Sequence, residues 1–182
     1  MRVEFNTFRD TYNELMSDVE IAKELDSELY SEDFIKRTYT RAFFALVEGV
    51  VSQLKKIALA ANEQVKIFQD FEVALLNERS GFLASNGVAK ESKAMLEFMP
   101  NIVFSLNYSA KALGLNYTVK KEGGYQSMLD AIKIRDRITH PKGKSCVVIG
   151  NDEMNTLADA NAWFRHEVVR LMKLIRENHE VV

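Results

Sequence analysis

The segment 133–144, KIRDRITHPKGK, carries side chains that could act on a phosphodiester. It holds five basic residues and one carboxylate, and His140 stands before a proline. Histidine exchanges protons near neutral pH, which makes His140 a candidate general acid or base. A fixed cation can offset the charge of a phosphorane, which is the role we expect for Arg135. An arginine beside a titratable histidine is the minimum set for RNA cleavage without a metal ion.

Further residues of this segment complete the candidate site. Asp136 follows the arginine and could orient one of the two catalytic groups. Three further cations are candidates for binding the RNA backbone: Arg137, Lys142 and Lys144. The same pattern also fits a structural role, in which Arg135 is ion-paired with Asp136 and His140 caps the last carbonyls of a helix.

The position of the segment at a helix end matters for its geometry. A helix is expected over 125–139, and Pro141 disfavours helical geometry at the residue before it. In a continuous helix, Arg135 and His140 would point about 140° apart. A helix that loosens at 139–140 would let the imidazole turn towards the face that carries the arginine.

Glu48 is the one charged residue in the apolar run AFFALVEGVV. A buried carboxylate needs a partner to stay charged, so we expect Glu48 to be buried and paired. Arg41 lies seven residues earlier on the same helix face, and Arg135 and Arg137 are candidates from another helix. The pair could be a core contact that orients a helix, or Glu48 could hold an active-site arginine in position.

The composition indicates long helices and few turns. The 182 residues include only 8 glycines and 2 prolines, with 47% hydrophobic and 27% charged residues. The single cysteine, Cys146, excludes an internal disulfide framework and a cysteine-based zinc site. The N-terminal residues show no secretory signal. We therefore expect one all-α domain over 1–182, an up-and-down helical bundle in the cytoplasm, with no cofactor and no metal.

The pattern of apolar residues predicts the positions of the helices. Helices are expected over 4–29, 31–62, 67–78, 90–113 and 125–139, and from Asn151 onward. Ser31 and Asn151 are the expected N-terminal caps, and Pro100 is expected to kink or split its helix. Residues 79–87 are expected as a loop, and 146–150 as a short extended piece. An apolar seam from Met154 to Ile175 lies either in the core or against a partner.

The charge distribution leaves two interpretations open. Residues 1–33 hold ten acidic and three basic residues, and the rest of the chain is mildly basic. Solvated helix faces would explain this, and so would a basic surface that meets an anion such as RNA. The two other histidines, His166 and His179, lie among charges and are expected to face solvent.

RDRITH at the end of a helix in an all-helical chain resembles the HEPN superfamily, whose ribonuclease members carry an arginine, four to six residues and a histidine there. The run RAFFALVEGVVSQLKK resembles the central helix of that family. The resemblance implies a bundle that pairs into a homodimer, with two motifs facing each other across a cleft as one composite site. It assigns Arg135 and His140 as catalytic, with Asp136 at the polar position.

The resemblance also implies an activity and partners. Many HEPN proteins are metal-independent endoribonucleases of prokaryotic toxin–antitoxin, abortive-infection or other defence systems, with RNA as substrate and an antitoxin or defence protein as partner. Some toxins of the family carry a tyrosine two residues after the histidine, where this chain has Lys142. The alternatives are a non-catalytic HEPN-like module that binds a nucleotide or a partner protein, and a helical dimer without a ligand.

Overall fold

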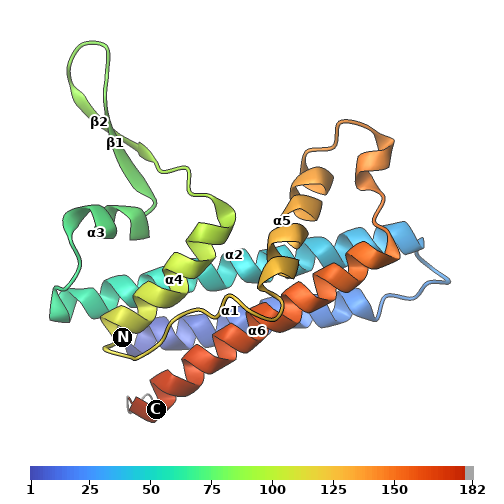
Figure 1. Ribbon diagram of the computed structural model, residues 1–182, viewed down its shortest axis with the longest axis horizontal. Coiled ribbons are helices and arrows are strands. Elements are labelled where there is room, and N and C mark those ends of the chain that lie inside the picture. Colours follow the sequence, from blue (N-terminus) through green and yellow to red (C-terminus); the bar gives the residue numbers. More distant parts are fainter. Residues whose placement is uncertain (179–182) are drawn as a thin grey trace.

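The computed structural model describes residues 1–178 as a helical bundle with one projecting β-hairpin (Figure 1). The helices are α1 (Arg2–Lys23), α2 (Glu32–Val65), α3 (Asp70–Leu76), α4 (Phe98–Ala112), α5 (Tyr125–Thr139) and α6 (Asn151–Asn178). The hairpin consists of β1 (Arg79–Leu83) and β2 (Ala89–Lys93), and a short 3-10 turn, η1 (Lys144–Val147), precedes α6. The mainly helical architecture is confirmed. None of the helices in this part of the chain has the length and apolar character to cross a membrane.

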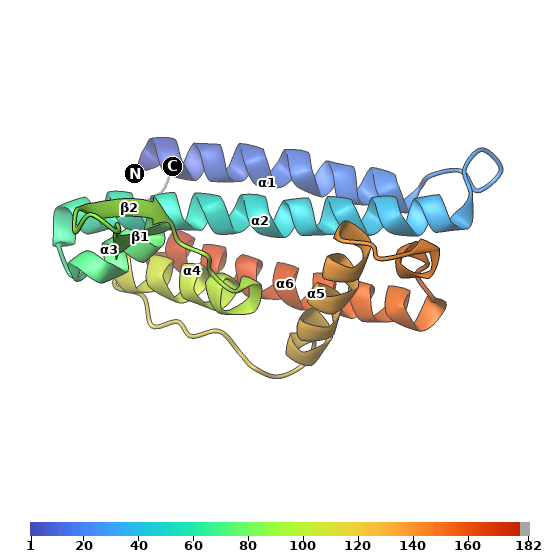
Figure 2. The same ribbon diagram turned by 90° about the horizontal axis from the view of Figure 1, so that it is seen from above.

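Helix α2 lies at the centre of the bundle, as its apolar run predicts. It packs against α1 and α4 most extensively and also contacts α3, α5 and α6. Phe43, Leu46, Val47 and Leu54 are fully buried along it. Figure 2 shows α1 and α2 side by side, with α4 and α6 on the other side of α2. The core of the protein therefore surrounds α2.

The order of the helices differs from a simple up-and-down bundle. Helices α1 and α2 run in opposite directions, but α4 and α6 run in the same direction as α2 (Figures 1 and 2). The connection 113–124 makes this possible, because it returns along the length of the bundle before α5 begins. Helix α5 then crosses the bundle and presents its C-terminal end on the face from which the hairpin projects (Figure 1).

Helix α1 is held close to α2 at a glycine. A Cβ atom on Gly49 would lie 2.4 Å from Cδ1 of Leu15, so a larger residue there would force the Leu15 side chain to move. The helix ends at Lys23 and not near residue 29 as expected. The Asp26 side chain accepts a hydrogen bond from the backbone N–H of Glu28 at 2.7 Å, which favours a turn over a further helical turn.

Of the two expected helix caps, Ser31 is confirmed and Asn151 is wrong. The Ser31 hydroxyl accepts a hydrogen bond from the backbone N–H of Phe34, which confirms the cap of α2. At the start of α6, the Asn151 side chain instead accepts a hydrogen bond from Lys36 of α2 at 2.8 Å. The Glu153 carboxylate accepts one from the backbone N–H of residue 150, so it takes the place of the expected cap.

The expected loop over 79–87 and the first part of the helix expected from residue 90 are wrong. These residues form an antiparallel hairpin in which Arg79 pairs with Lys93 and Leu83 with Ala89. Its turn contains Asn86 followed by Gly87, which has a positive φ of 75°. Asparagine followed by glycine between two extended runs is a strong hairpin signal, because both residues tolerate left-handed geometry.

The expected kink at Pro100 and the expected extended piece over 146–150 are also corrected. Helix α4 begins at Phe98, which places Pro100 in its first turn. A first-turn N–H has no partner within the helix, so proline is tolerated there and neither kinks nor splits α4. Of the piece expected to be extended over 146–150, the first two residues belong to the 3-10 turn η1, and Val148 after them has extended geometry.

The seam on α6 belongs to the core of this chain. Leu157, Phe164, Val168, Leu171 and Ile175 are all buried. The sequence left open whether the seam packs in the core or against a partner, and the structure decides for the core. The seam therefore gives no support to a dimer.

A buried carboxylate lies on the same helix. Glu167 is fully buried and accepts hydrogen bonds from the Tyr117 hydroxyl and the Arg170 guanidinium. Burial, together with the Glu167 carboxylate, raises the pKa of Tyr117. His166 is exposed as expected, and His179 lies outside the described residues.

Candidate functional site

Helix α5 positions the candidate catalytic motif. Ile134 and Ile138 are buried against the bundle, which fixes the helix with Arg135 on a half-exposed side. The helix ends at Thr139 as the sequence predicts, and the backbone N–H of His140 still donates to the carbonyl of Asp136 at 3.0 Å. His140 itself has φ −120° and ψ 61°, which is not helical. The chain therefore leaves the helix at the histidine, as the following proline requires.

Arg135 is held by two carboxylates and an aromatic ring. Its guanidinium donates to Glu48 on α2 at 2.6 Å and to Asp136 at 3.0 Å. It also lies 5.0 Å from the centre of the Phe98 ring on α4. Burial opposes the charge, but the carboxylates of Asp136 and Glu48 outweigh it and raise the pKa of Arg135. The side chain remains 27% exposed, so an oriented cation is presented to solvent.

Glu48 is exposed and not buried as expected, with a side-chain exposed fraction of 53%. Its face of α2 is turned towards the end of α5, which covers it only in part. Its ion pair is with Arg135, and within residues 1–178 it forms no ion pair with Arg41. Of the two roles left open by the sequence, the contact fits the second, in which Glu48 positions the arginine.

Because Glu48 is exposed, replacing it should affect the orientation of Arg135 more than the stability of the fold. We expect Glu48→Ala to change the free energy of unfolding by no more than about 1 kcal/mol, because exposed ion pairs contribute little. If the site cleaves RNA, we expect the cleavage rate to fall about ten- to a hundredfold, because Arg135 would lose the carboxylate that orients its guanidinium. Glu63→Ala, at an exposed position of the same helix, is the matched control and should change neither quantity. A loss of several kcal/mol in a denaturant titration would contradict the exposed placement.

Arg41 lies beside this pair and remains free. It lines a hollow of about 180 Å³ together with Glu48, Arg135 and Thr139. Arg41 is exposed, and its guanidinium has no ion pair or hydrogen bond within residues 1–178. The sequence assigned it a supporting role next to Glu48, but the structure leaves it as a cation available to a ligand.

His140 is accessible but stands apart from the arginine. The residue is exposed, and its imidazole makes no hydrogen bond or ion pair with any part of the described chain. It does not line the hollow to which Arg135 contributes. One chain therefore brings Arg135, Glu48, Asp136 and Arg41 together and leaves His140 outside the group.

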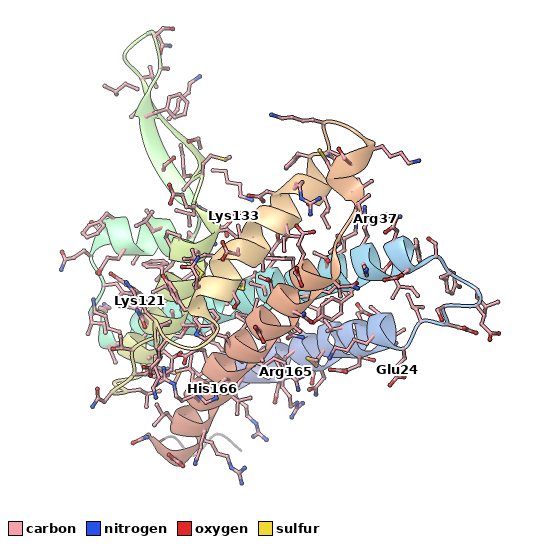
Figure 3. All side chains as sticks on the ribbon, turned by 45° about the vertical axis from the view of Figure 1, so that its right-hand side comes forward. Glu24, Arg37, Lys121, Lys133, Arg165 and His166 are labelled. Carbon is pink, nitrogen blue, oxygen red and sulfur yellow. The ribbon has the colours of Figure 1, made fainter. Side chains whose placement is uncertain are left out.

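Arg137 is occupied by contacts within the chain. Its guanidinium donates to the carbonyls of Cys146 at 3.0 Å and Val148 at 2.7 Å, and to the Glu153 carboxylate at 2.6 Å. Arg37 of α2, labelled in Figure 3, donates to the neighbouring carbonyl of Val147. These bonds tie η1 to α2 and α6, so the geometry fits Arg137 as a support of the loop and not as the expected RNA ligand.

Lys142 and Lys144 extend from the loop that Arg137 supports. Both are exposed, and neither has an ion pair within the part of the chain that the structure describes. They stand next to His140 in the chain, at the end of α5. Their position agrees with the expected contact to an anionic backbone.

Two further hollows are lined by residues that contact Arg135. One of about 300 Å³ is lined by Glu48 and Phe98. Another of about 850 Å³ lies between α4 and α5, with Phe98 and Asp136 at its edge and mostly apolar side chains along it. Lys121 and Lys133, both labelled in Figure 3, also line the larger hollow. The residues that contact Arg135 therefore also line hollows next to its own: Glu48 and Phe98 line the smaller one, and Phe98 and Asp136 the larger one.

Phe98 is the site residue that the sequence did not indicate. It lies 37 positions before Arg135, at the start of a helix that was expected to begin elsewhere. Its position before Pro100 marks a helix start, and no local pattern links it to α5. Only the packing of α4 beside α5 brings it under the arginine.

No three histidine, cysteine, aspartate or glutamate side chains that could hold a metal ion lie together in residues 1–178. Comparisons of the chain with protein-family models, with curated proteins and with solved structures found no match. The resemblance to the HEPN superfamily therefore depends on the motif and its helical setting.

Proposed function

We propose that the protein is a metal-independent endoribonuclease of HEPN type that acts as a homodimer in a prokaryotic defence or toxin–antitoxin system. The observation that carries the proposal is Arg135, a half-exposed guanidinium oriented by Glu48 and Asp136, five residues before an exposed histidine at the helix end. The class of system and a cognate antitoxin or defence partner come from the family resemblance.

The chemistry assigns one role to each group. A 2′-hydroxyl attacks the adjacent phosphorus and the 5′-oxygen of the next nucleotide leaves, which gives a 2′,3′-cyclic phosphate. His140 takes the proton from the 2′-hydroxyl or gives one to the leaving oxygen. Arg135 offsets the charge that grows on the phosphorane oxygens. Arg41, Lys142 and Lys144 contact the RNA backbone on either side.

The dimer supplies what one chain lacks. Arg135 and His140 do not share a hollow within one protomer. In an isologous two-fold pair, a residue of one protomer contacts a different residue of the other and the contact is repeated reciprocally, so the imidazole of each protomer can complete the arginine hollow of its partner. The composite site also gathers many cations in one place, which makes an anionic ligand favourable.

The test is incubation of the purified protein with a structured RNA that contains unpaired loops, in the presence of EDTA. We expect cleavage to persist and to leave 2′,3′-cyclic phosphate ends, because the 2′-hydroxyl is the nucleophile. Cleavage that depends on added Mg²⁺ would contradict the proposal. RNA binding without cleavage would also contradict it and would favour the second candidate function.

The second candidate is a non-catalytic HEPN-like module that binds a nucleotide or a partner protein. One observation favours it. Two carboxylates already contact Arg135, so much of its charge is offset before any ligand arrives. The apolar hollow of about 850 Å³ beside Asp136 would then be the binding surface.

A further inference from the structure

The β1–β2 hairpin is an exposed element with little support from the bundle. Every residue of its two strands is exposed, and beyond its own pairing it packs mainly against α3. Figure 1 shows it projecting from the same side of the bundle as the C-terminal end of α5. An isolated two-stranded hairpin is marginally stable, so packing within this chain does not by itself account for the hairpin.

The two faces of the hairpin differ in chemistry. Paired residues share a face, so Ser80 and Ser92 lie on the same side as Phe82 and Lys90. The two hydroxyls are 2.9 Å apart, and the Phe82 side chain is 49% exposed. Lys90 makes no ion pair within residues 1–178. This face, the Phe82–Lys90 face, therefore presents an aromatic ring, a free cation and hydroxyls without a carboxylate.

The opposite face has its charges satisfied. Arg79 is paired with Glu91 at 3.4 Å, and Lys93 with Glu78 at 3.4 Å. The exposed Leu83 shares this face. Opposite charges there neutralise each other, so the face has no preference for an anion.

The hairpin is connected to the arginine site by a hollow. The depression of about 300 Å³ is lined by Lys93 and Met95 at the base of the hairpin and by Glu48 and Phe98 at the site. The hollow therefore joins the arginine site to the base of the hairpin on the side that carries Lys93, and a bound chain reaches the Phe82–Lys90 face by passing around the hairpin from there.

We propose that the Phe82–Lys90 face binds an unpaired stretch of RNA that flanks the cleaved bond. This rests on the proposed function, because it assigns the substrate of the same site. An exposed ring stacks on a base of any sequence, and a free lysine contacts the phosphate beside it. A base within a duplex offers no free face for stacking, so the preference is for single-stranded RNA.

The first experiment measures the binding of a labelled oligouridylate to the full chain by fluorescence anisotropy. We expect Phe82→Ala to weaken binding about five- to a hundredfold, because one stacked base is lost. Lys90→Ala should weaken binding and lower the slope of log K against log salt by about 0.7. Leu83→Ala and Arg79→Ala, on the opposite face, are the matched controls and should bind like the parent. Phe82→Tyr should retain binding, because the ring is kept.

The second experiment separates the hairpin from the catalytic site. Phe82→Ala should cleave a dinucleotide at the parent rate and a long RNA more slowly. If Phe82→Ala and Lys90→Ala bind and cleave long RNA like the parent, the hairpin assignment is overturned and the ribonuclease stands. If the parent binds RNA through the hairpin but cleaves nothing, the hairpin assignment stands and the ribonuclease fails. If Phe82→Ala instead dissociates the dimer in sedimentation, the hairpin is a contact between copies and the proposal is overturned.

Discussion

Replacing His140 by alanine is expected to reduce RNA cleavage by about 10²- to 10⁴-fold. Positioned proton transfer contributes this much to a reaction in which a hydroxyl attacks and an alkoxide leaves. Substrate binding should change little, because the cations that contact the backbone, among them Lys142 and Lys144, remain. The measurement is the single-turnover rate on a saturating RNA substrate in EDTA.

The fold should survive this substitution. His140 is exposed at the end of α5 and its imidazole has no partner within the described residues, so no core contact is lost. The melting temperature should match the parent. His166→Ala, an exposed histidine on α6, is the matched control and should cleave normally. Cleavage that survives in His140→Ala would remove this residue from the mechanism and point to a contaminating nuclease.

The local geometry of the site was predictable from the sequence, but its partners were not. Pro141 forces α5 to end at Thr139, so the position of His140 at the helix end follows from local sterics. The contact between Glu48 and Arg135 joins residues 87 positions apart, and the sequence offered it only as one of three pairings. The prediction that Glu48 is buried was wrong. An apolar run predicts burial on all sides of the helix, whereas α5 crosses α2 and leaves part of that face open.

In the fold, too, the sequence predicted some elements and missed others. Helix positions followed from apolar periodicity, and the bounds of α5 were predicted to the residue. The hairpin was missed although its turn signal, Asn86–Gly87, is local. Its strands have no apolar face to bury, so the alternation that normally marks a strand is absent. Because packing within the bundle does not explain the hairpin, we infer that its role lies in contact with a ligand.

Buried charges could not be located from the sequence. Glu72 and Glu167 are buried, yet each stands in a helical segment that mixes polar and apolar residues in the ordinary way. Glu72 is stabilised by Tyr108 and Lys111 of α4, which lie more than 35 positions away. Burial and the hydrogen bond to Glu72 raise the pKa of Tyr108 to about 12. The burial of such carboxylates depends on tertiary contacts, and no spacing of residues in the sequence predicts it.

The second large effect is expected at Arg135. Arg135→Ala should reduce cleavage by about 10²- to 10³-fold, because the charge on the phosphorane loses its fixed counterion. Arg135→Lys should recover only part of the rate, because an ammonium group cannot match the planar fork of the guanidinium. Stability should change little, because the ion pairs are with exposed carboxylates. Arg165→Ala, which removes a surface pair with Glu20, is the matched control.

A mixing experiment then tests whether the site is composite. If Arg135 of one protomer works with the imidazole of the other, a dimer of one Arg135→Ala chain and one His140→Ala chain contains one site with both groups intact. Refolding the two inactive variants together should therefore restore up to roughly a quarter of the parent activity, by random pairing and one active site in each mixed dimer. If both groups act within one chain, every site in the mixture lacks one of them and no activity returns. A mixture that stays inactive while light scattering shows mixed dimers would contradict the shared site.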